Sequence, residues 1–540
     1  MTVTETEAPH APGTTAAALA PPRPATGLAV VLGTGEHRTV GRLWIFTAFV
    51  FLLVAGVAGA LVGVEKVDTA GLGDVLDADV FAQTYSLHAV AGTFLFLFPL
   101  FIGLATSVVP AQVGASTIAF PRAAAAAYWT YLAAGGVLIA SFLADGGPFG
   151  SDGEAVELFV AAFVAVLVAL TLGAICVGTT AVALRVPGMG LHRAPLFTWS
   201  SLVTVAVAVL TLPVLAGLMV LVYVDHRYGG DGGTFLGGSE GVFQRIAWAW
   251  AQPNVYLFAI PVLGIVGDIV PVTARTRLTK HRIAMGCIGA FGVFAFGAWA
   301  MPSVSAESAT TLRYVGDVPF YAFSFLVLLP LLGLAGLLAD TVRRGSARLA
   351  SPLLWGIAAL LMLLAGAANG ALVSIEPLDL VETTAQSSQI HYVLLAALLG
   401  LFAGLAHWAP PVLGRVVAEV PSKGLAALGL VGTVLLCLPD LISGFLDQLW
   451  RHGGATDDVD AVEALNIASI AGGVLLVLVA IAFLGLVLQA AMGDADADPD
   501  PWEGHTLEWA DPAAPPAITS EAPLYDARHG AGTTTTEAQP

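Results

Sequence analysis

Long apolar stretches that carry almost no charge recur along the whole chain and alternate with short polar segments. Each stretch is long enough to cross about 30 Å of hydrocarbon as a helix. The stretches are continuous rather than alternating in ten-residue segments, which disfavours a membrane β-barrel. Because a backbone in lipid must satisfy its own hydrogen bonds, the pattern predicts an all-α polytopic membrane protein. We predict twelve spans, near residues 43–65, 82–110, 124–143, 157–184, 197–223, 243–271, 283–302, 317–340, 351–375, 387–414, 424–446 and 465–492.

The composition supports a membrane domain with a polar tail at each end. Hydrophobic residues make up 57% of the 540 positions and charged residues 11%, less than half the usual share of about 25%. Residues 1–39 are rich in Ala, Pro and Thr, and residues 493–540 are acidic and rich in Pro. We expect both tails to be disordered, with residues 40–492 forming the twelve-span domain.

The loops between the predicted spans alternate in charge. The positive-inside rule places the basic loops and both termini in the cytoplasm of a bacterial-type inner membrane. The acidic outer loops are consistent with a docking surface for a basic electron carrier. They are equally consistent with solvated loops that have no binding role, and the formal net charge of −18 does not distinguish these two interpretations. The basic residues that follow even-numbered spans are Arg122, Arg185, Arg193, Arg275, Arg277, Lys280, Arg282, Arg343, Arg344, Arg348, Arg415 and Lys423.

Three of the eleven histidines lie inside predicted spans, where an ionisable group is costly and indicates function. His88 and His391 begin spans that both run inward, so at 1.5 Å per residue both imidazoles lie less than roughly 10 Å below the outer surface. Two imidazoles at one depth on different helices can ligate a haem iron from both faces, or can be hydrogen-bonded core histidines. His407 has no partner at its depth, and we interpret it as structural.

Several motifs resemble subunit I of the haem–copper oxidases, the cytochrome c oxidase group. YSLHAVAGTFLFLFPLFIGLATSVVPAQVGASTIAFPR (Tyr85–Arg122) resembles the second span and its following loop. WAWAQPNVYLFAIPVLGIVGDIVP (Trp248–Pro271) resembles the sixth span, and SQIHYVLLAALLGLFAGLAHW (Ser388–Trp408) the tenth. Glu36–Ala48 resembles the start of the first span, and Leu378–Thr384 the loop before the tenth. The resemblance covers residues 36–492 and implies the twelve-helix bundle of that family.

The resemblance implies a low-spin haem, of a or b type. His88 matches one axial ligand, in the place of the family's MHGT-like motif, and His391 matches the other. Arg451 fits one of the paired arginines that hold haem propionates, while the partner position is Trp450. Anionic propionates need a cation at the membrane surface, so the assignment of Arg451 is chemically sensible.

The resemblance implies that the family's second metal centre has lost its ligands in this chain. Gln389 replaces the histidine that holds the high-spin haem, and an amide is a poor iron ligand beside imidazole. Of the three copper-ligating histidines, one is Gln252 and the other two are Met301 and Pro302. Imidazole ligands make such a copper site, so copper is not expected.

The residues that carry protons in the family are also replaced. Asn254 stands for the glutamate of W-x-x-G-H-P-E-V-Y, and Thr117 for the aspartate at the mouth of one channel. Leu334 stands for the lysine of the second channel. Tyr256 is retained, but its cross-linked histidine partner is absent, so we expect a packed or hydrogen-bonded aromatic.

Three functions remain open from the sequence. The first is an electron-transfer subunit with one bis-His haem, working with other respiratory-complex subunits and a carrier such as cytochrome c, a cupredoxin or quinone. The second is a terminal oxidase with an unfamiliar site, although O₂ reduction needs an open metal position, so enzyme activity is uncertain. The third is a non-redox transporter or assembly scaffold. Nothing in the sequence indicates a nucleic-acid partner.

Overall fold

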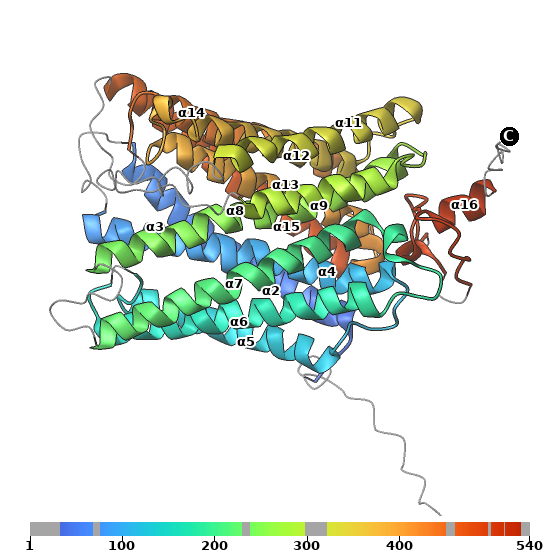
Figure 1. Ribbon diagram of the computed structural model, residues 1–540, viewed down its shortest axis with the longest axis horizontal. Helices are drawn as coiled ribbons and strands as arrows, with labels where there is room; N and C mark the ends of the chain where they lie inside the picture. Colours follow the sequence, from blue (N-terminus) through green and yellow to red (C-terminus); the bar gives the residue numbers. More distant parts are fainter. Residues whose placement is uncertain are drawn as a thin grey trace, which may run out of the picture. The chain divides into compact units, whose positions relative to one another are not determined.

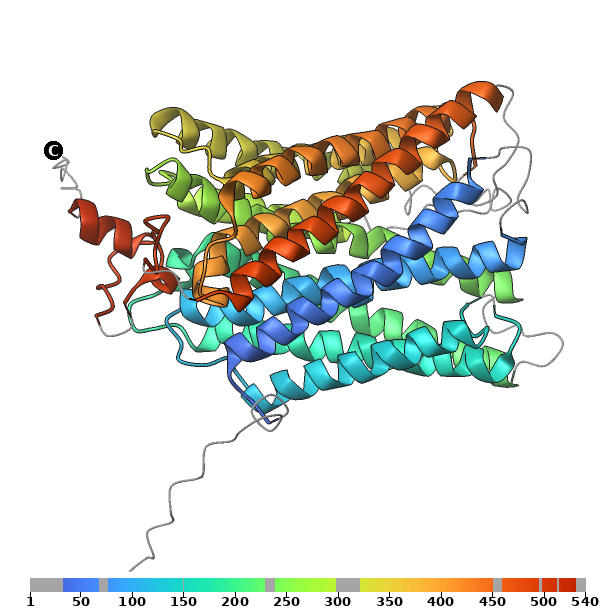
Figure 2. The same cartoon turned by 180° about the vertical axis from the view of Figure 1, so that it is seen from behind.

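The computed structural model describes residues 33–67, 76–148, 150–228, 238–297, 321–449, 459–494, 498–511 and 514–530. The chain divides into two compact units, Met1–Thr34 and Gly35–Pro540, and every helix named below belongs to the second. This unit is a bundle of long helices (Figures 1 and 2). Within the described residues β-structure is limited to one isolated bridge, between Thr383 and Leu449. The prediction of an all-α fold is confirmed.

The bundle is built from helices that follow the predicted apolar stretches in order. The helix α3 continues through a π-helical segment, η1, into α4, and the three form one span from Asp79 to Gln112. The helices are α2 (His37–Glu65), α3 (Ala78–Val90), η1 (Ala91–Leu97), α4 (Phe98–Gln112), α5 (Pro121–Leu143), α6 (Gly153–Ala183), α7 (Leu196–Tyr228), α8 (Gly238–Thr273), α9 (His281–Gly297), α11 (Leu328–Arg344), α12 (Ser351–Val373), α13 (Thr384–Leu413), α14 (Glu419–Gly444) and α15 (Val459–Met492).

The number of spans agrees closely with the prediction. Eleven helices in the described part of the chain are long and apolar enough to cross a membrane, and a shorter apolar helix, His281–Ala295, occupies the place of the seventh predicted span. Twelve is therefore approximately right. Uncharged apolar runs of this length are favoured as membrane helices because each helix satisfies its own backbone hydrogen bonds.

Helix α13 lies in the interior of the bundle and contacts α4, α8, α12 and α14. Aromatic side chains fix its position against two neighbours. Phe402 stacks on Phe483 of α15 with ring centroids 4.2 Å apart, and meets Trp355 of α12 edge-on at 5.4 Å. All three side chains are fully buried. Such aromatic contacts add to the energy of burial, so α13 is a firmly held support for the residues it carries.

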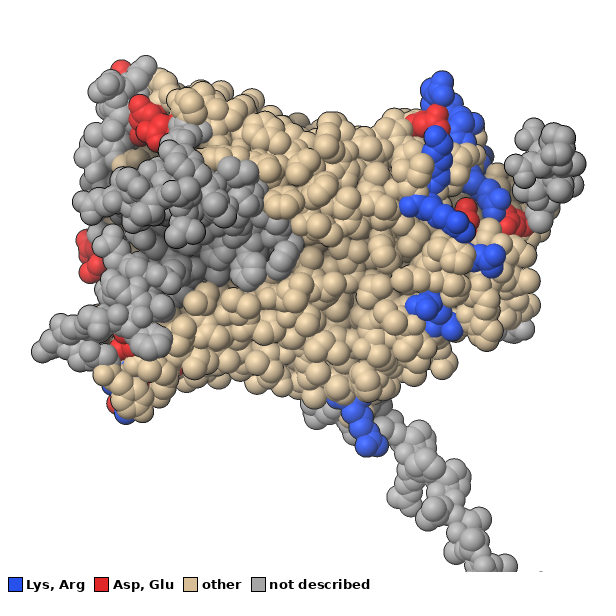
Figure 3. Space-filling model, in the orientation of Figure 1, with Lys and Arg blue, Asp and Glu red and all other residues tan. Residues whose placement is uncertain are grey.

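The charged side chains separate toward the two ends of the bundle. Figure 3 shows Lys and Arg gathered at one end, where α11 ends in Arg343 and Arg344 and where the C-terminal segment lies. Acidic side chains are visible at the opposite end of the same face. Tan side chains, neither acidic nor basic, occupy the surface between the two ends, as expected for a surface in contact with lipid.

The described part of the C-terminal tail differs from the expected disorder. Residues 498–511 and 514–530 contain the short helices η5 (Leu507–Trp509) and α16 (Pro523–His529), and they lie at the basic end of the bundle (Figure 1). Trp502 and Trp509 are buried. The acidic, Pro-rich composition suggested disorder because composition is an average over the whole segment. The two tryptophans supply enough apolar surface to hold the segment against the bundle.

Candidate functional site

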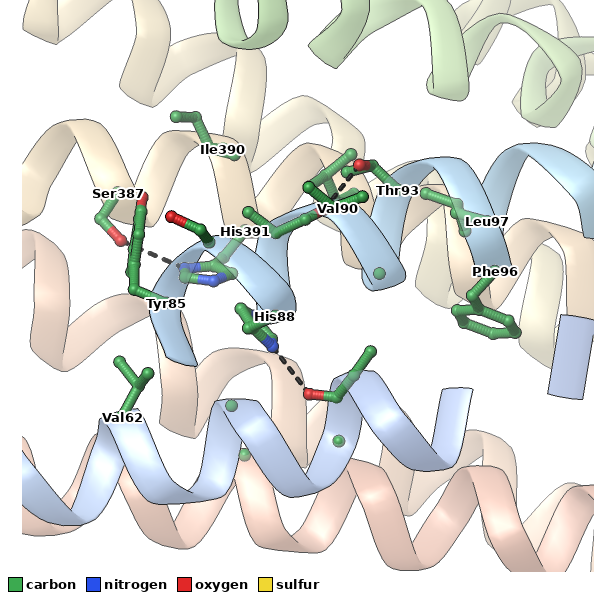
Figure 4. A pocket seen from close by; sticks show the side chains of 18 of the residues that line it. Val62, Tyr85, His88, Val90, Thr93, Phe96, Leu97, Ser387, Ile390 and His391 are labelled. Carbon is green, nitrogen blue, oxygen red and sulfur yellow. Dashed lines mark hydrogen bonds between the residues drawn. The ribbon is translucent and has the colours of Figure 1, made fainter. Parts of the chain in front are cut away.

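His88 and His391 face each other inside the bundle. His88 lies near the end of α3 and His391 lies two turns into α13. Their ring centroids are 6.4 Å apart and the ring planes are inclined by 47°. Figure 4 shows the two imidazoles side by side in the cavity, although they come from helices about three hundred residues apart. The structure therefore brings together the two histidines that sequence depth had paired.

Each imidazole has a partner at its Nδ1 atom. Nδ1 of His88 lies 2.8 Å from the carbonyl oxygen of Ala55 on α2. A carbonyl only accepts hydrogen bonds, so this Nδ1 carries the proton and Nε2 keeps its lone pair. Nδ1 of His391 lies 3.3 Å from Oγ of Ser387, one turn earlier in α13. Fixing the ring through one nitrogen while the other binds a metal is the usual arrangement of metal-ligating histidines.

A glycine on α2 gives His88 the room that it needs. A Cβ atom on Gly59 would lie 2.6 Å from both Cε1 and Nδ1 of His88, closer than non-bonded atoms approach. The π-helical segment Ala91–Leu97 begins three residues after His88. Such segments are rare and are found often at functional sites. The backbone on both sides of His88 is thus shaped around its imidazole.

The two histidines line a large cavity of about 550 Å³. Most of the lining is apolar and comes from helices on both sides of the pair, including α2, α6, α14 and α15. Lys66, at the C-terminal end of α2, is the one Lys or Arg in this lining among the described residues. Nδ2 of Asn466 donates a hydrogen bond of 2.7 Å to the carbonyl oxygen of Lys66, which fixes the backbone there. Besides the two histidines, the other charged or titratable residues described in the lining are Tyr85, Asp225, His226 and Asp440.

The pair has the spacing that a shared metal ion requires. Imidazole nitrogens bind metals at about 2 Å, so an ion between two Nε2 atoms places the ring centroids roughly 6 Å apart, as observed at 6.4 Å. The described residues contain no group of three or more His, Cys, Asp and Glu side chains that could hold a metal. A metal at this pair would therefore bring its other ligands with it, as a haem iron does.

Gln389, which the resemblance marks as altered, lies in contact with the retained Tyr256. The side chain of Gln389 on α13 is hydrogen-bonded with the hydroxyl of Tyr256 on α8. Both residues are buried, at 8% and 4% exposure. A Cβ atom on Gly370 of α12 would lie 2.8 Å from Nε2 of Gln389 and 2.9 Å from the Tyr256 hydroxyl. The amide and the phenol therefore fill the space where α8, α12 and α13 meet.

The remaining predicted positions are dispersed or not described. Thr117 lies in the loop between α4 and α5, and Leu334 is fully buried on α11. Gln252 and Asn254 lie on α8, in the part whose side chains the structure does not describe. The positions that fall outside the described residues are Met301, Pro302, Trp450 and Arg451.

His407 lies toward the far end of α13 and does not join the pair. Its ring packs edge-on against Trp408 and against Trp509 of the tail, with centroid distances of 5.2 Å in both cases. Its carbonyl oxygen accepts a hydrogen bond of 3.0 Å from Nε1 of Trp502. This histidine is thus part of the contact between the bundle and the tail.

Sequence reasoning missed three residues of the site. Ser387 lies four residues before His391, a spacing that places both on one helix face, and this signal could have identified it. Lys66 directly follows the first predicted span, and no role was predicted for it, although it lines the cavity. Gly59 carried no usable signal, because α2 contains several glycines and only the fold shows which one contacts His88.

Comparisons with known proteins agree with this architecture. The family model described as "Cytochrome C and Quinol oxidase polypeptide I" matches residues 39–475. A Streptomyces coelicolor protein named "Putative cytochrome c oxidase subunit 1-beta" is 30% identical, over 92% of this chain and 90% of its own. "Cytochrome c oxidase subunit 1" of Thermostichus vulcanus is 28% identical, over 89% and 88%.

A solved structure has the same fold. A haem–copper terminal oxidase dimer, determined by cryo-electron microscopy, superposes with a TM-score of 0.63 at 14% identity, covering 91% of this chain and 89% of that one. At this level of identity the likeness establishes the arrangement of helices. Together with the family match over most of its length, it shows that the chain belongs to the cytochrome c and quinol oxidase polypeptide I family, whose members include subunit I of cytochrome c oxidase.

Proposed function

We propose that this chain is a membrane-embedded electron-transfer subunit that holds one low-spin haem between His88 and His391 and has no O₂-reducing haem–copper centre of its own. The observation that carries the proposal is the pair of imidazoles 6.4 Å apart in a cavity of about 550 Å³. A haem iron held by both imidazoles would have no open coordination position for O₂. A haem held in this way supplies one-electron transfer.

The surrounding residues fix the orientation of the two imidazoles and leave Nε2 of each free to bind iron. Ala55 accepts from Nδ1 of His88 and holds that imidazole in one tautomer and one orientation. Ser387 does the same for His391 from one turn away. Gly59 allows the His88 ring to lie directly against α2. These contacts are preorganised, so binding of the cofactor requires little rearrangement of the chain.

Lys66 is suited to hold an anionic edge of the cofactor. Haem propionates carry negative charge, and a cation in a partly dry cavity stabilises them. Lys66 is close enough to act electrostatically on both His391 and Asp440. We propose Lys66 as one propionate partner, with Arg451 as the second.

The contact between Tyr256 and Gln389 supports the loss of the second metal centre. Gln389 occupies the position of the high-spin haem ligand, and its amide is bonded to Tyr256 rather than open to a metal. An amide competes poorly with imidazole for iron or copper. The replacement of the copper ligands by Gln252, Met301 and Pro302 supports the same conclusion, and so do Asn254 and Thr117 for the proton routes.

We infer that the site lies in the outer half of the membrane. Lys66 and Asp225 line the cavity at the C-terminal ends of α2 and α7, and the basic loops lie at the other ends of these helices. With the basic loops and both termini in the cytoplasm, the histidine pair faces an outer carrier such as cytochrome c or a cupredoxin, or a membrane quinone. Other respiratory subunits would supply the remaining redox steps.

The competing function is a working terminal oxidase, which the names of the relatives favour. It needs a second haem and copper held by ligands other than those of the family. A transporter or assembly scaffold is the third possibility, and the apolar lining of the cavity offers it little support, because transporters bind solutes at polar, broken helices.

A reduced-minus-oxidised absorbance spectrum of the purified protein, repeated with carbon monoxide and combined with iron and copper analysis, separates the three functions. One iron per chain, no copper and no carbon monoxide shift supports the electron-transfer subunit. Two irons with copper and a carbon monoxide shift would establish the oxidase. Protein that folds and never binds haem would leave the transporter or scaffold.

A further inference from the structure

A second group of buried polar residues lies at the basic end of the bundle, far along the helices from the histidine pair. Its centre is Glu508, in the helix η5 of the C-terminal segment, which is 8% exposed. Oε1 of Glu508 accepts two hydrogen bonds of 3.0 Å, from Nε2 of Gln112 on α4 and from Nε1 of Trp408 on α13. Oε2 of Glu508 is buried and has no hydrogen-bond partner.

A second carboxyl group lies on the other side of Gln112. Nε2 of Gln112 also donates a hydrogen bond of 3.0 Å to Oδ2 of Asp268 on α8. Asp268 accepts two more, from the backbone N–H groups of Leu196 at 2.8 Å and Phe197 at 3.0 Å, at the start of α7. The carbonyl oxygen of the Gln112 side chain accepts a hydrogen bond of 2.7 Å from the hydroxyl of Thr198, so the amide cannot flip to exchange its nitrogen and oxygen.

No Lys or Arg side chain pairs with either carboxyl group in the described part of the chain. The nearby cations have other partners: Arg277 pairs with Asp526, and Arg528 with Asp500. Arg348 lies 5.5 Å from the ring of Trp502. The other titratable groups at this contact are His407, packed between Trp408 and Trp509, and His505, packed against Tyr525.

Two buried carboxylates bridged by one neutral amide cannot both be ionised at low cost. Each charge would be separated from water without a cation, and the two would repel each other across Gln112. We propose that Asp268 and Glu508 form a proton-binding site in which one proton is held on Glu508, so that a bound proton helps to attach the C-terminal segment to the bundle. Asp268 belongs to the bundle and Glu508 to the C-terminal segment. The segment is called seated when it is in contact with the bundle at this site.

The hydrogen bonds assign the proton to Glu508 rather than to Asp268. Asp268 accepts three N–H groups, two of them at a helix N-terminus, where the helix dipole favours negative charge. Glu508 has an oxygen without a partner, and an unpaired hydroxyl is far less costly in a buried contact than an unpaired anionic oxygen.

The proposal has a direct consequence for the segment. When Glu508 loses its proton to solvent, a second negative charge faces Asp268 in the contact, and the seated state becomes less favourable. The contribution of this proton to seating is complete below about pH 4.3, where a free glutamate is protonated as well. It is lost by about tenfold per pH unit as the pH rises to the pKa of seated Glu508, and above that pKa it is gone. Through Glu508 alone, the segment should therefore loosen progressively as the pH rises from about 4.3 to the pKa of seated Glu508, and it should change no further above that pKa.

Infrared spectroscopy of the purified full-length protein can detect the proton. The wild type should show the C=O stretch of a buried carboxylic acid at neutral pH, and Glu508→Gln should remove it. Glu503→Gln, at an exposed glutamate of the same segment, is the matched control and should leave the band unchanged. Asp268→Asn removes the repelling charge, so the band should disappear at a lower pH than in the wild type.

Hydrogen exchange across residues 501–510, corrected for the intrinsic pH dependence of exchange, provides the second measurement. From about pH 6.5 up to the pKa of seated Glu508, wild-type protection should fall by about tenfold per pH unit and then level off, and Glu508→Gln should lack this fall. A carboxylic acid band that survives in Glu508→Gln would overturn the proposal. So would an Asp268→Asn protein whose band disappears at a higher pH, or a Glu508→Gln protein whose segment is loose at neutral pH.

Discussion

The hydroxyl of Tyr256 and the amide of Gln389 are hydrogen-bonded to each other in a buried position beside Gly370. Removing the amide with Gln389→Ala should leave a buried phenol without its partner. We expect a loss of about 1–3 kcal/mol of stability, the usual cost of an unsatisfied buried group. Thermal unfolding in detergent, followed by tryptophan fluorescence, measures the change.

The double mutant and a surface control test this interpretation. Adding Tyr256→Phe should recover part of the loss, because the unpaired hydroxyl is then gone. Gln386→Ala, three residues away, removes an amide whose one hydrogen bond is exposed, and it should change stability much less. Strict additivity of the two buried substitutions would contradict a pairwise bond between Tyr256 and Gln389.

Removal of either imidazole should abolish haem binding. His88→Ala and His391→Ala each leave one ligand in a cavity that is otherwise apolar, and we expect haem per chain to fall by about tenfold or more, an energy of about 1.4 kcal/mol or greater. The pyridine haemochrome assay measures this ratio. His192→Ala, at an exposed histidine, should keep the wild-type ratio. Full haem content in the double mutant His88→Ala/His391→Ala would refute the proposed site.

The close approach of α2 to His88 predicts a specific effect of one methyl group. Gly59→Ala places a Cβ atom 2.6 Å from the His88 ring, so the imidazole or the helix must move and haem content should fall. Gly217→Ala is the matched control, because a Cβ atom at this position of a membrane helix meets nothing within 4 Å. It should leave the haem content unchanged. Equal haem content in both variants would show that the His88 ring is not held by α2.

The charge of Lys66 should raise the reduction potential of the bound cofactor. A cation nearby favours the electron-rich ferrous state, so Lys66→Met should lower the potential; a tenfold change in the ferric-to-ferrous ratio corresponds to about 59 mV. Spectroelectrochemical titration measures it, and haem content should stay close to wild type. Lys423→Met, which removes an amine paired with Glu419 at 3.0 Å on α14, should not shift the potential. An unchanged potential in Lys66→Met would exclude an electrostatic effect of Lys66 on the haem, but it would not contradict haem binding by His88 and His391.

The helices could be predicted from the sequence because charge-free apolar runs have few alternatives in lipid. The histidine pair could also be predicted, since an imidazole inside a span is rare and both lay at one depth. The contact between Gln389 and Tyr256 could not be derived from either position, because it depends on how α8 packs against α13. The two residues are more than a hundred positions apart, and each alone suggests only a lost ligand or a packed aromatic.

The C-terminal segment was the main difference between sequence and structure. Its composition matches that of disordered chains, because Asp, Pro and Ala dominate the average. The seated segment instead depends on a few side chains, such as Trp502, Trp509 and Glu508, whose partners lie on α4 and α13. Composition cannot reveal such partners, since the receiving surface forms only when the bundle has folded.

Acid should loosen the same segment through His505. Burial lowers the pKa of His505 to about 3, whereas the free imidazole of the detached segment titrates near its usual value of about 6.5. A depressed pKa means that the detached state binds the proton more tightly. The contribution of His505 to seating is therefore complete above about pH 6.5 and is lost progressively, by about tenfold per pH unit, as the pH falls toward 3.

Hydrogen exchange of residues 514–530 between pH 7 and pH 4, corrected for intrinsic rates, measures this loosening. Every protein in this test, including the reference, carries Glu508→Gln, because Glu508 would otherwise contribute a pH dependence of opposite sign. His505→Phe keeps an aromatic ring against Tyr525 but cannot be protonated, so its segment should stay protected on acidification. His529→Asn, at an exposed histidine of α16, should behave as the reference. If His505→Phe loosened in acid as much as the reference, another group would have to be the acid-sensitive one, and the buried imidazole would have no part in seating the segment.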